Sequence, residues 1–264
     1  MPGSISRLER FDVVGSTNDV VRGWLADGTP EICVAVAEEQ TAGRGRDGRS
    51  WMAPAGAALL LSIGFRPVWL RPEHLWRLAA ITSVAMAEAG EEAAALPAGS
   101  ILLKWPNDLV LESSDGVRKL AGVLGETDGL GSDDPRAVIG IGVNGDWAPS
   151  DFPAELAGSM TSLRELAGRP IDHAALLAGF LDRLDVAAAA LREGQFDAPG
   201  WSARQVTTDR DIDLIRPDGT RTTVRATGVD TESGALVVGE TRILVGEIEH
   251  VRLAATDAAP RIAV

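Results

Sequence analysis

Residues 31–65, EICVAVAEEQTAGRGRDGRSWMAPAGAALLLSIGF, contain the pattern that decides the fold. The apolar runs 31–39 and 57–65 are typical of strands. A polar stretch rich in glycine and arginine, TAGRGRDGRSW (41–51), separates them. We therefore expect a loop that links two strands. This context limits the ligands that the loop can bind, because some ligand-binding loops must be followed by a helix.

The loop satisfies the dinucleotide-binding pattern G-x-G-x-x-G through Gly43, Gly45 and Gly48. That pattern also requires the last glycine to begin a helix, with an acidic residue about 20 positions further on. Here Pro54 and Gly56 oppose a helix, and SIGFRP stands where the acidic residue is needed. The context excludes a Rossmann site, and the sequence also lacks the P-loop pattern G-x-x-x-x-G-K-S/T.

The composition of the chain limits its partners. The formal net charge is −13, so the average surface repels nucleic acid and anionic membranes. Arginine–glycine segments that bind RNA are usually long and disordered, whereas this one is short and lies between strands. Arginines gathered in one loop of an acidic protein indicate a small anion, with a solvated charge run as the alternative. We expect no nucleic-acid or membrane partner.

Cellular location is predicted from the N-terminus and from cysteine usage. The first residues, MPGSISRLERFD, show no apolar signal region, and no apolar stretch approaches the length of a membrane span. Cys33 is the single cysteine, which excludes an internal disulfide. We expect a cytoplasmic protein.

The order of predicted elements along the chain indicates an α+β fold, a mixed β-sheet with helices packed on it. After about residue 203, short β-rich runs separated by turns indicate a small all-β unit. We expect two domains, residues 1–202 and 203–264. Further strands are expected at 7–14, 101–112, 118–127 and 137–146, and helices at 15–28, 71–94, 151–168 and 171–194, the last capped by Asp172.

Other polar residues stand at the ends of the predicted strands, and each has an ordinary structural explanation. Asn107 and Asp108 in KWPND could present oxygens to a metal or could end a strand. Lys119 could be a surface residue, and Asn144 could be a turn former. Trp51 could stack on a flat ring or belong to the core. The residue types alone leave these alternatives open.

Taken in order, five motifs resemble those of the biotin protein ligase family: GSTN (15–18), QTAGRGRDGRSW (40–51), KWPNDL (104–109), RKLAGVLGE (118–126) and GIGVN (140–144). Each motif alone is modest, but the ordered set is specific. The resemblance runs from about residue 8 to the C-terminus. It implies a fold like that of class II synthetases and biotin ligases, with a small SH3-like β-barrel at the C-terminal end.

The resemblance also implies a two-step reaction. Biotin and ATP would form biotinyl-5′-AMP and pyrophosphate, and biotin would then pass to one lysine of a biotin carboxyl carrier domain of an acyl-CoA or pyruvate carboxylase. Attack of the biotin carboxylate on the α-phosphate builds negative charge, which cations and Mg²⁺ stabilise. The arginine loop would act as a lid that keeps water from the adenylate.

Site residues follow from the resemblance, position by position. Lys119 and Arg46 would be catalytic. The biotin pocket would contain Ser16, Thr17, Asn18, Gln40, Gly43, Arg44, Gly45, Arg46, Trp51, Lys119 and Gly122. ATP and its phosphates would contact Arg44, Arg46, Arg49, Lys104, Asn107, Lys119 and Asn144, and Asn107 and Asp108 would hold the cofactor Mg²⁺.

Three related functions compete with this one. Some bacterial members also repress transcription through an N-terminal DNA-binding domain, but few residues precede the first predicted strand, so we expect no direct repressor activity. A lipoate ligase or octanoyl transferase would resemble biotin ligases in fold, but GRGRDGRSW with KWPND favours biotin. A module that senses biotin without chemistry is the alternative from outside the enzymes.

Overall fold

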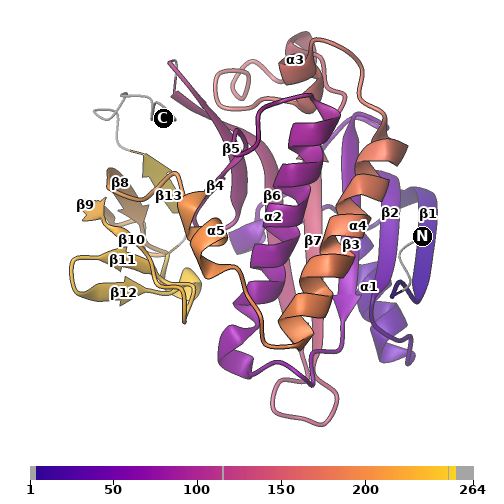
Figure 1. Cartoon of the computed structure of the whole chain (residues 1–264). Coiled ribbons are helices and arrows are strands. Elements are labelled where there is room, and N and C mark those ends of the chain that lie inside the picture. The colour runs from indigo at the N-terminus through magenta and orange to yellow at the C-terminus, as the bar shows by residue number, and fades with distance from the viewer. Residues whose placement is uncertain (1–3, 115, 249, 254–264) are drawn as a thin grey trace.

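A computed structural model of the chain describes residues 4–114, 116–248 and 250–253. Its centre is a seven-stranded sheet in the order β1–β2–β3–β7–β6–β5–β4 (Figure 1). β1 and β2 pair in parallel, whereas the other neighbouring pairs are antiparallel, so the predicted mixed sheet is confirmed. The strands are β1 (Arg7–Val14), β2 (Cys33–Gln40), β3 (Ala58–Phe65), β4 (Leu102–Lys104), β5 (Asp108–Ser113), β6 (Gly116–Asp128) and β7 (Arg136–Asn144).

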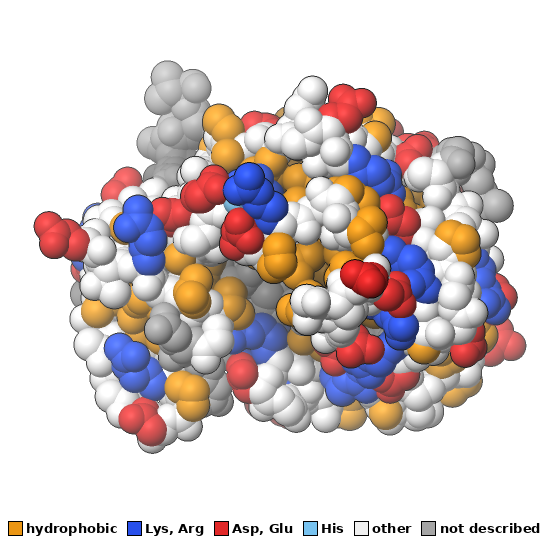
Figure 2. All heavy atoms as spheres, turned by 90° about the horizontal axis from the view of Figure 1, so that it is seen from below, with side chains coloured by type: hydrophobic (Ala, Val, Ile, Leu, Met, Phe, Trp, Pro, Cys, Tyr) orange, Lys and Arg blue, Asp and Glu red, His pale blue; other side chains and the backbone are white. Residues whose placement is uncertain are grey.

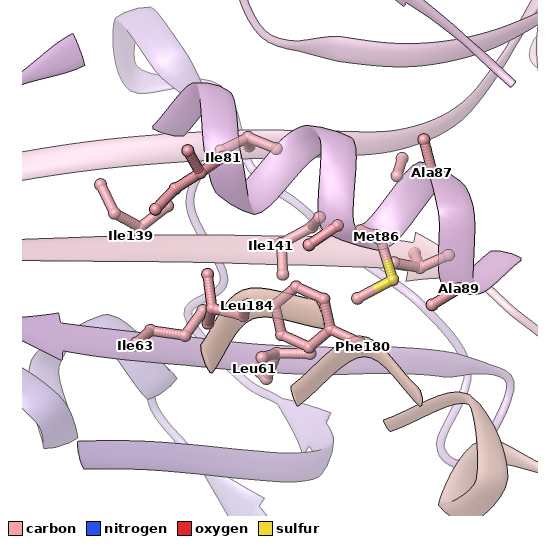
Figure 3. Close-up of a cluster of buried hydrophobic side chains, with 14 of the residues drawn as sticks. Leu61, Ile63, Ile81, Met86, Ala87, Ala89, Ile139, Ile141, Phe180 and Leu184 are labelled. Atoms are coloured by element: carbon pink, nitrogen blue, oxygen red, sulfur yellow. The ribbon is translucent and has the colours of Figure 1, made fainter. Parts of the chain in front are cut away.

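Helices cover both faces of this sheet. α2 (Trp76–Ala93) and α4 (His173–Arg192) lie side by side on one face (Figure 1), and α1 (Thr17–Ala26) packs against β2, β3 and β7 on the other. Phe180 and Leu184 of α4 meet isoleucines and leucines of β3 and β7 beneath α2 (Figure 3). In β2, Val34 belongs to this core and Cys33 to the smaller one under α1, as period-two alternation requires.

Helix boundaries follow from capping chemistry in the case of α4. The Asp172 carboxylate accepts hydrogen bonds from the backbone N–H groups of Ala174 and Ala175 at 2.8 and 3.0 Å. These bonds satisfy two of the donors that a helix start leaves open, and the predicted cap is confirmed. α2 begins at Trp76 rather than at 71, because residues Pro72–His74 form a separate 3-10 turn. α5 (Ala198–Ala203) was not predicted.

Two predicted elements differ from the structure in type or length. The expected strand 101–112 is a hairpin, in which β4 and β5 pair antiparallel and Lys104 stands opposite Asp108. The expected helix 151–168 shrinks to α3 (Leu163–Ala167), which follows a 3-10 turn at Pro149–Asp151. The backbone between them pairs with β6 instead: the Lys119 N–H donates to Ser159 at 2.7 Å, and the Thr161 N–H donates to Lys119 at 2.9 Å.

The C-terminal part is β-rich, as predicted. Its strands form two three-stranded sheets, β13–β8–β9 and β10–β11–β12 (Figure 1). Trp105, from the turn between β4 and β5, enters their apolar core, and its Nε1 donates to the Gly234 carbonyl at 3.0 Å. Residues 249 and 254–264 of the expected domain 203–264, and residues 1–3 and 115 of the expected domain 1–202, lie outside the described residues. The strands are β8 (Arg210–Ile215), β9 (Arg221–Ala226), β10 (Gly228–Val229), β11 (Leu236–Val238), β12 (Thr241–Ile243) and β13 (His250–Leu253).

Charged and apolar side chains are mixed on the face of the molecule seen from below (Figure 2). Seen from below, lysine and arginine side chains lie beside aspartate and glutamate side chains (Figure 2). Ion pairs such as that between Arg136 and Asp134, at 2.6 Å, account for such neighbours. No helix in the described part of the chain is both long and apolar enough to cross a membrane.

Candidate active site

A cavity of about 140 Å³ lies between the sheet, the start of α1 and the loop that joins β2 to β3. The fold brings segments more than 100 residues apart in sequence, such as those of Thr17 and Gly122, to its walls. Of the sequence-predicted site residues, Ser16, Thr17, Asn18, Gln40, Arg44, Gly45, Arg46, Arg49, Trp51, Asn107, Asp108, Lys119 and Gly122 line it. Gly43, Lys104 and Asn144 do not.

Glycines of β6 and β7 form the floor of this cavity. Gly122 pairs with Gly142 across the two strands, and a Cβ at Gly142 would stand 2.5 Å from the Trp51 ring. The indole therefore lies directly on the sheet, where any larger residue would collide with it. Gly140, two residues before Gly142, gives the same clearance to Asn18, whose Oδ1 would be 2.2 Å from a Cβ there.

One end of the cavity is polar and uncharged. Gln40 Oε1 accepts from the Thr17 N–H at 2.8 Å and from the Thr17 hydroxyl at 3.0 Å. The buried Ser62 hydroxyl donates to Asn18 Oδ1 at 2.5 Å. These bonds fix the side chains before any ligand arrives, and such preorganisation favours recognition of a neutral polar group.

The other end carries charge. Lys119 Nζ lies 2.6 Å from one oxygen of Asp108 and 5.3 Å from the centre of the Trp51 ring. Lys104 Nζ binds the second oxygen of Asp108 at 2.9 Å. Burial by itself raises the pKa of the Asp108 carboxyl, but the two ammonium groups outweigh it and lower that pKa to about 2. Asp108 is thus ionised at neutral pH.

The arginine loop closes on itself and reaches the C-terminal part. The Gly45 N–H donates to Arg49 at 2.6 Å and the Trp51 N–H donates to Gly43 at 2.9 Å, so Gly43 belongs to the base of the loop. The Arg46 guanidinium donates to the carbonyls of Val245 and Ile248 at 3.0 and 2.8 Å. Burial lowers the pKa of Arg46. The loop is thereby fastened across the cavity.

The other two arginines of the loop bind acidic side chains. Arg44 donates to Asp19 at 2.7 Å and lies 3.3 Å from Glu126, and the hydrogen bond to Asp19 raises the pKa of Arg44. Arg49 lies 3.3 Å from Asp47. The predicted contacts of Arg44 and Arg49 with phosphate would require these ion pairs to rearrange.

A second cavity of about 230 Å³ continues from the first. Arg46, Asn107 and Asp108 line both, and Lys104 lines the second. Asn107 Nδ2 donates to Val123 at 2.9 Å, which leaves its amide oxygen for a ligand. Trp76, Trp105 and Trp201 form apolar walls.

The Asn144 side chain binds backbone carbonyl groups and lines neither cavity. Its Nδ2 donates to the carbonyl of Thr161 at 2.9 Å and lies 3.4 Å from that of Lys119. The amide therefore ties the segment before α3 to the start of β6, the strand that carries Lys119. Its predicted contact with nucleotide stays a prediction.

The predicted metal pair has few free oxygens. Both Asp108 oxygens bind lysine, and no group of three or more His, Cys, Asp or Glu in the described ranges could hold a metal ion. Asn107 and Asp108 therefore do not form a metal-binding site by themselves. Magnesium is compatible with this cavity as an ion carried mainly by phosphate oxygens, which is its usual mode of binding.

Sequence reasoning missed Ser62, Glu126, Gly140 and Gly142. The two glycines did carry a signal, because positions 140 and 142 of a strand share one face while Ile139 and Ile141 share the other. Glu126 is the last residue of the motif RKLAGVLGE, but its partners are far away in the sequence and gave no sign of its role; Ser62 lies in none of the five motifs.

Comparisons with known proteins agree on one family. The sequence profile of the Biotin/lipoate A/B protein ligase family matches residues 11–144. A biotin–acetyl-CoA-carboxylase ligase of Mycobacterium tuberculosis is 31% identical over 259 residues, which are 95% of this chain and 92% of that protein. A bifunctional ligase/repressor BirA of Bacillus subtilis is 34% identical over 166 residues, so the chain spans about half, 49%, of that relative.

Solved structures agree with the sequence relatives. The biotin protein ligase from Aquifex aeolicus in complex with biotin and ATP superposes with a TM-score of 0.75 at 26% identity. The match covers 96% of this chain and 100% of that one, and thus includes the C-terminal strands as well as the seven-stranded sheet.

Proposed function

The chain belongs to the biotin/lipoate A/B protein ligase family, and from this we propose that it is a biotin protein ligase. It would activate biotin with ATP to biotinyl-5′-AMP and transfer biotin to a lysine of a carrier domain. The observation that carries the proposal is the order of groups along the cavity: Asn18 over Gly140, then Trp51 over Gly142, then Lys119 beside Gly122. Biotin presents a ureido group, an apolar chain and a carboxylate in that same order.

Each part of biotin would meet matching chemistry. The ureido group would hydrogen-bond with Ser16, Thr17, Asn18 and Gln40. The thiophane ring and the valeryl chain would lie along Trp51 and the glycine floor, with Gly43 and Gly45 shaping the loop above. Their apolar surface would leave water there, which is favourable by about 25 cal/mol per Å². The carboxylate would then lie at Lys119.

Lys119 is proposed as the central catalytic residue, because it can contact both the biotin carboxylate and the α-phosphate. Attack forms the new carboxyl–phosphate bond and breaks the bond to the leaving pyrophosphate, and no proton transfer is needed. At 4 Å and an effective dielectric constant of 20, one such charge pair is worth about 4 kcal/mol before desolvation. The lysine accelerates the step to the extent that this contact strengthens in the transition state.

ATP is proposed to extend into the second cavity, where Lys104, Asn107 and Arg46 lie at the junction with the first. Arg44, Arg49 and Asn144 would join the phosphates after a rearrangement of their present hydrogen bonds. Mg²⁺ would enter bound to the triphosphate and neutralise part of its charge, and the Asn107 amide oxygen would be available to it as a ligand.

The acceptor is proposed to be the biotin carboxyl carrier domain of an acyl-CoA or pyruvate carboxylase. The name of the Mycobacterium tuberculosis relative supports an acetyl-CoA carboxylase. We also propose that residues 203–264 are a separate domain of the SH3-like type, supported by the two small sheets and their own apolar core.

Purified protein tests the proposed function directly. With Mg-ATP and labelled biotin, we expect biotinyl-5′-AMP, pyrophosphate and, after addition of a carrier domain, one biotinylated lysine. A parallel reaction contains lipoate. Adenylate formation with lipoate but not with biotin would identify a lipoate ligase instead, and binding of biotin without pyrophosphate release would identify a sensor.

Gly142→Ala is expected to raise the KM for biotin about tenfold, because overpacking costs about 1–3 kcal/mol. The added Cβ would collide with Trp51, which must then move into the space for biotin. Steady-state kinetics at saturating ATP measure the effect. Gly23→Ala is the matched control, since a Cβ at that position of α1 meets nothing within 4 Å. An unchanged KM in Gly142→Ala would mean that Trp51 does not border the biotin site.

Arg46→Gly is expected to let biotinyl-5′-AMP escape, because the variant loses both hydrogen bonds that fasten the loop to the C-terminal part. Labelling of unrelated bystander proteins should rise about tenfold or more, as expected when about 1.4 kcal/mol of loop anchoring is lost. Arg71→Gly, at an exposed arginine outside both cavities, serves as the control. Wild-type bystander labelling with sustained adenylate synthesis would show that Arg46 does not hold the lid.

A further inference from the structure

Glu126, at the far end of β6, is a carboxylate to which the proposed reaction assigns no task. Its side chain is 26% exposed, and it lies among three donors from two other parts of the chain. Glu126 Oε2 accepts a hydrogen bond from Asn18 Nδ2 at 2.6 Å, forms an ion pair with Arg22 at 2.7 Å, and lies 3.3 Å from Arg44 Nη2. One carboxylate thus touches both α1 and the arginine loop.

The contact with Asn18 fixes the orientation of that amide. An ionised carboxylate only accepts hydrogen bonds, so the NH₂ group of Asn18 must face Glu126. The amide oxygen then faces Ser62, which donates to it at 2.5 Å. Asn18 is 5% exposed and lines the first cavity. The Ser62 hydroxyl, by donating to the amide oxygen, polarises the amide and strengthens its remaining N–H as a donor toward a ligand.

The contact with Arg44 extends the same arrangement to the loop. Arg44 binds Asp19 through two hydrogen bonds at 2.7 and 2.8 Å and approaches Glu126 from above. Because Asp19 follows Asn18 directly, the residues that hold the loop are neighbours of the residue that lines the cavity. Binding of a ligand to Asn18 and movement of the loop would therefore both change the contacts of Glu126.

We propose that Glu126 is a positioning residue of the biotin site, which orients the Asn18 amide toward the ureido group and holds the loop through Arg44. This inference rests on the proposed function. Glu126 touches no reacting atom, so its effect should fall on biotin binding and on retention of the adenylate, and much less on the chemical step.

The test is Glu126→Gln, which keeps the shape of the side chain and removes its charge. A glutamine offers one acceptor oxygen in place of two, and its own NH₂ group can turn toward Asn18 or Arg44. We expect the KM for biotin to rise about tenfold, with kcat changed less than about threefold and the KM for ATP unchanged, since only ground-state positioning of biotin is lost. Dissociation of biotinyl-5′-AMP, followed by stopped-flow fluorescence, should be about fivefold faster.

Glu31→Gln is the matched control. Glu31 is 19% exposed and likewise accepts from an arginine, Arg192, at 3.2 Å, and from Trp69 Nε1 at 2.9 Å, but it lines neither cavity. This variant should lower the melting temperature without changing the KM for biotin. A general loss of stability would affect both variants alike. A rise in the KM for biotin that occurs only in Glu126→Gln, with little change in kcat, would therefore show that Glu126 positions the site rather than only supporting the fold.

Arg44→Met tests separately the contact between Glu126 and the arginine loop. It also replaces Glu126→Gln as the test variant if Glu126→Gln does not fold. It should speed adenylate dissociation, and the effect of the double variant should be smaller than the sum of the two single effects, because the two residues share one contact. Fully additive effects, or a KM for biotin in Glu126→Gln within about twofold of wild type, would overturn the inference. If the wild-type chain forms no biotinyl-5′-AMP, the proposed function fails and the inference fails with it; an active wild type with a normal Glu126→Gln overturns the inference alone.

Discussion

Lys119→Ala is expected to lower the rate of biotinyl-5′-AMP formation about 1,000-fold, which corresponds to a loss of about 4 kcal/mol of transition-state stabilisation. The lysine is the cation that lies between the Trp51 wall and Asp108, where the two reacting groups would meet. The fold should persist, because the Lys119 side chain is 29% exposed.

The measurement is pyrophosphate release from single turnovers at saturating biotin and ATP. Arg118→Ala is the matched control: it is the neighbouring residue on β6, it is ion-paired with Glu165 at 2.6 Å, and it lines neither cavity. We expect that variant to stay within about threefold of wild type, as for a part-exposed ion pair outside the site. Near-normal pyrophosphate release by Lys119→Ala would remove the lysine from its proposed role.

The main sheet could be predicted because most of its strands contain apolar runs bounded by turn residues. The strand–loop–strand arrangement around the arginine loop followed from the apolar runs on either side of it, and Pro54 and Gly56 excluded a helix after it. The segment 101–112 was predicted as one strand because Trp105 continues the apolar run, although a turn at KWPND was among the alternatives. In the structure the Trp105 side chain turns away into the C-terminal core. A local pattern does not reveal which of two cores an apolar residue joins.

The site could be predicted as a set of residues but not as a set of contacts. Thirteen of the residues named from motifs line one cavity. The resemblance assigned Arg44 to biotin and to phosphate, and the structure pairs its side chain with Asp19 and Glu126. These acids lie 25 and 82 residues away along the chain, so no spacing rule relates them to the loop. Ion pairs of this kind are set by tertiary folding.

Asp108→Asn is expected to slow adenylate formation about 100-fold, similar to the loss of one preorganised electrostatic contact. Lys104 and Lys119 are the two lysines of the chain, and both bind this carboxylate. An asparagine can offer its single oxygen to one of them only, so Lys119 loses its fixed position and two part-buried cations lie near each other with less compensation. The family resemblance implied a different role for Asp108, as a Mg²⁺ ligand.

The Mg²⁺ dependence of the Asp108→Asn rate separates these two roles. If the carboxylate positions lysines, kcat falls while the Mg²⁺ concentration for half-maximal rate is unchanged; a marked rise in that concentration would restore the role as a metal ligand. Unfolding at acid pH gives an independent check. The folded pKa of about 2 lies below the ordinary value of 3.8, so the stability contributed by Asp108 is complete above pH 3.8 and is lost as the pH falls through 2. Asp108→Asn should remove that part of the acid dependence, because it deletes the group that takes up the proton.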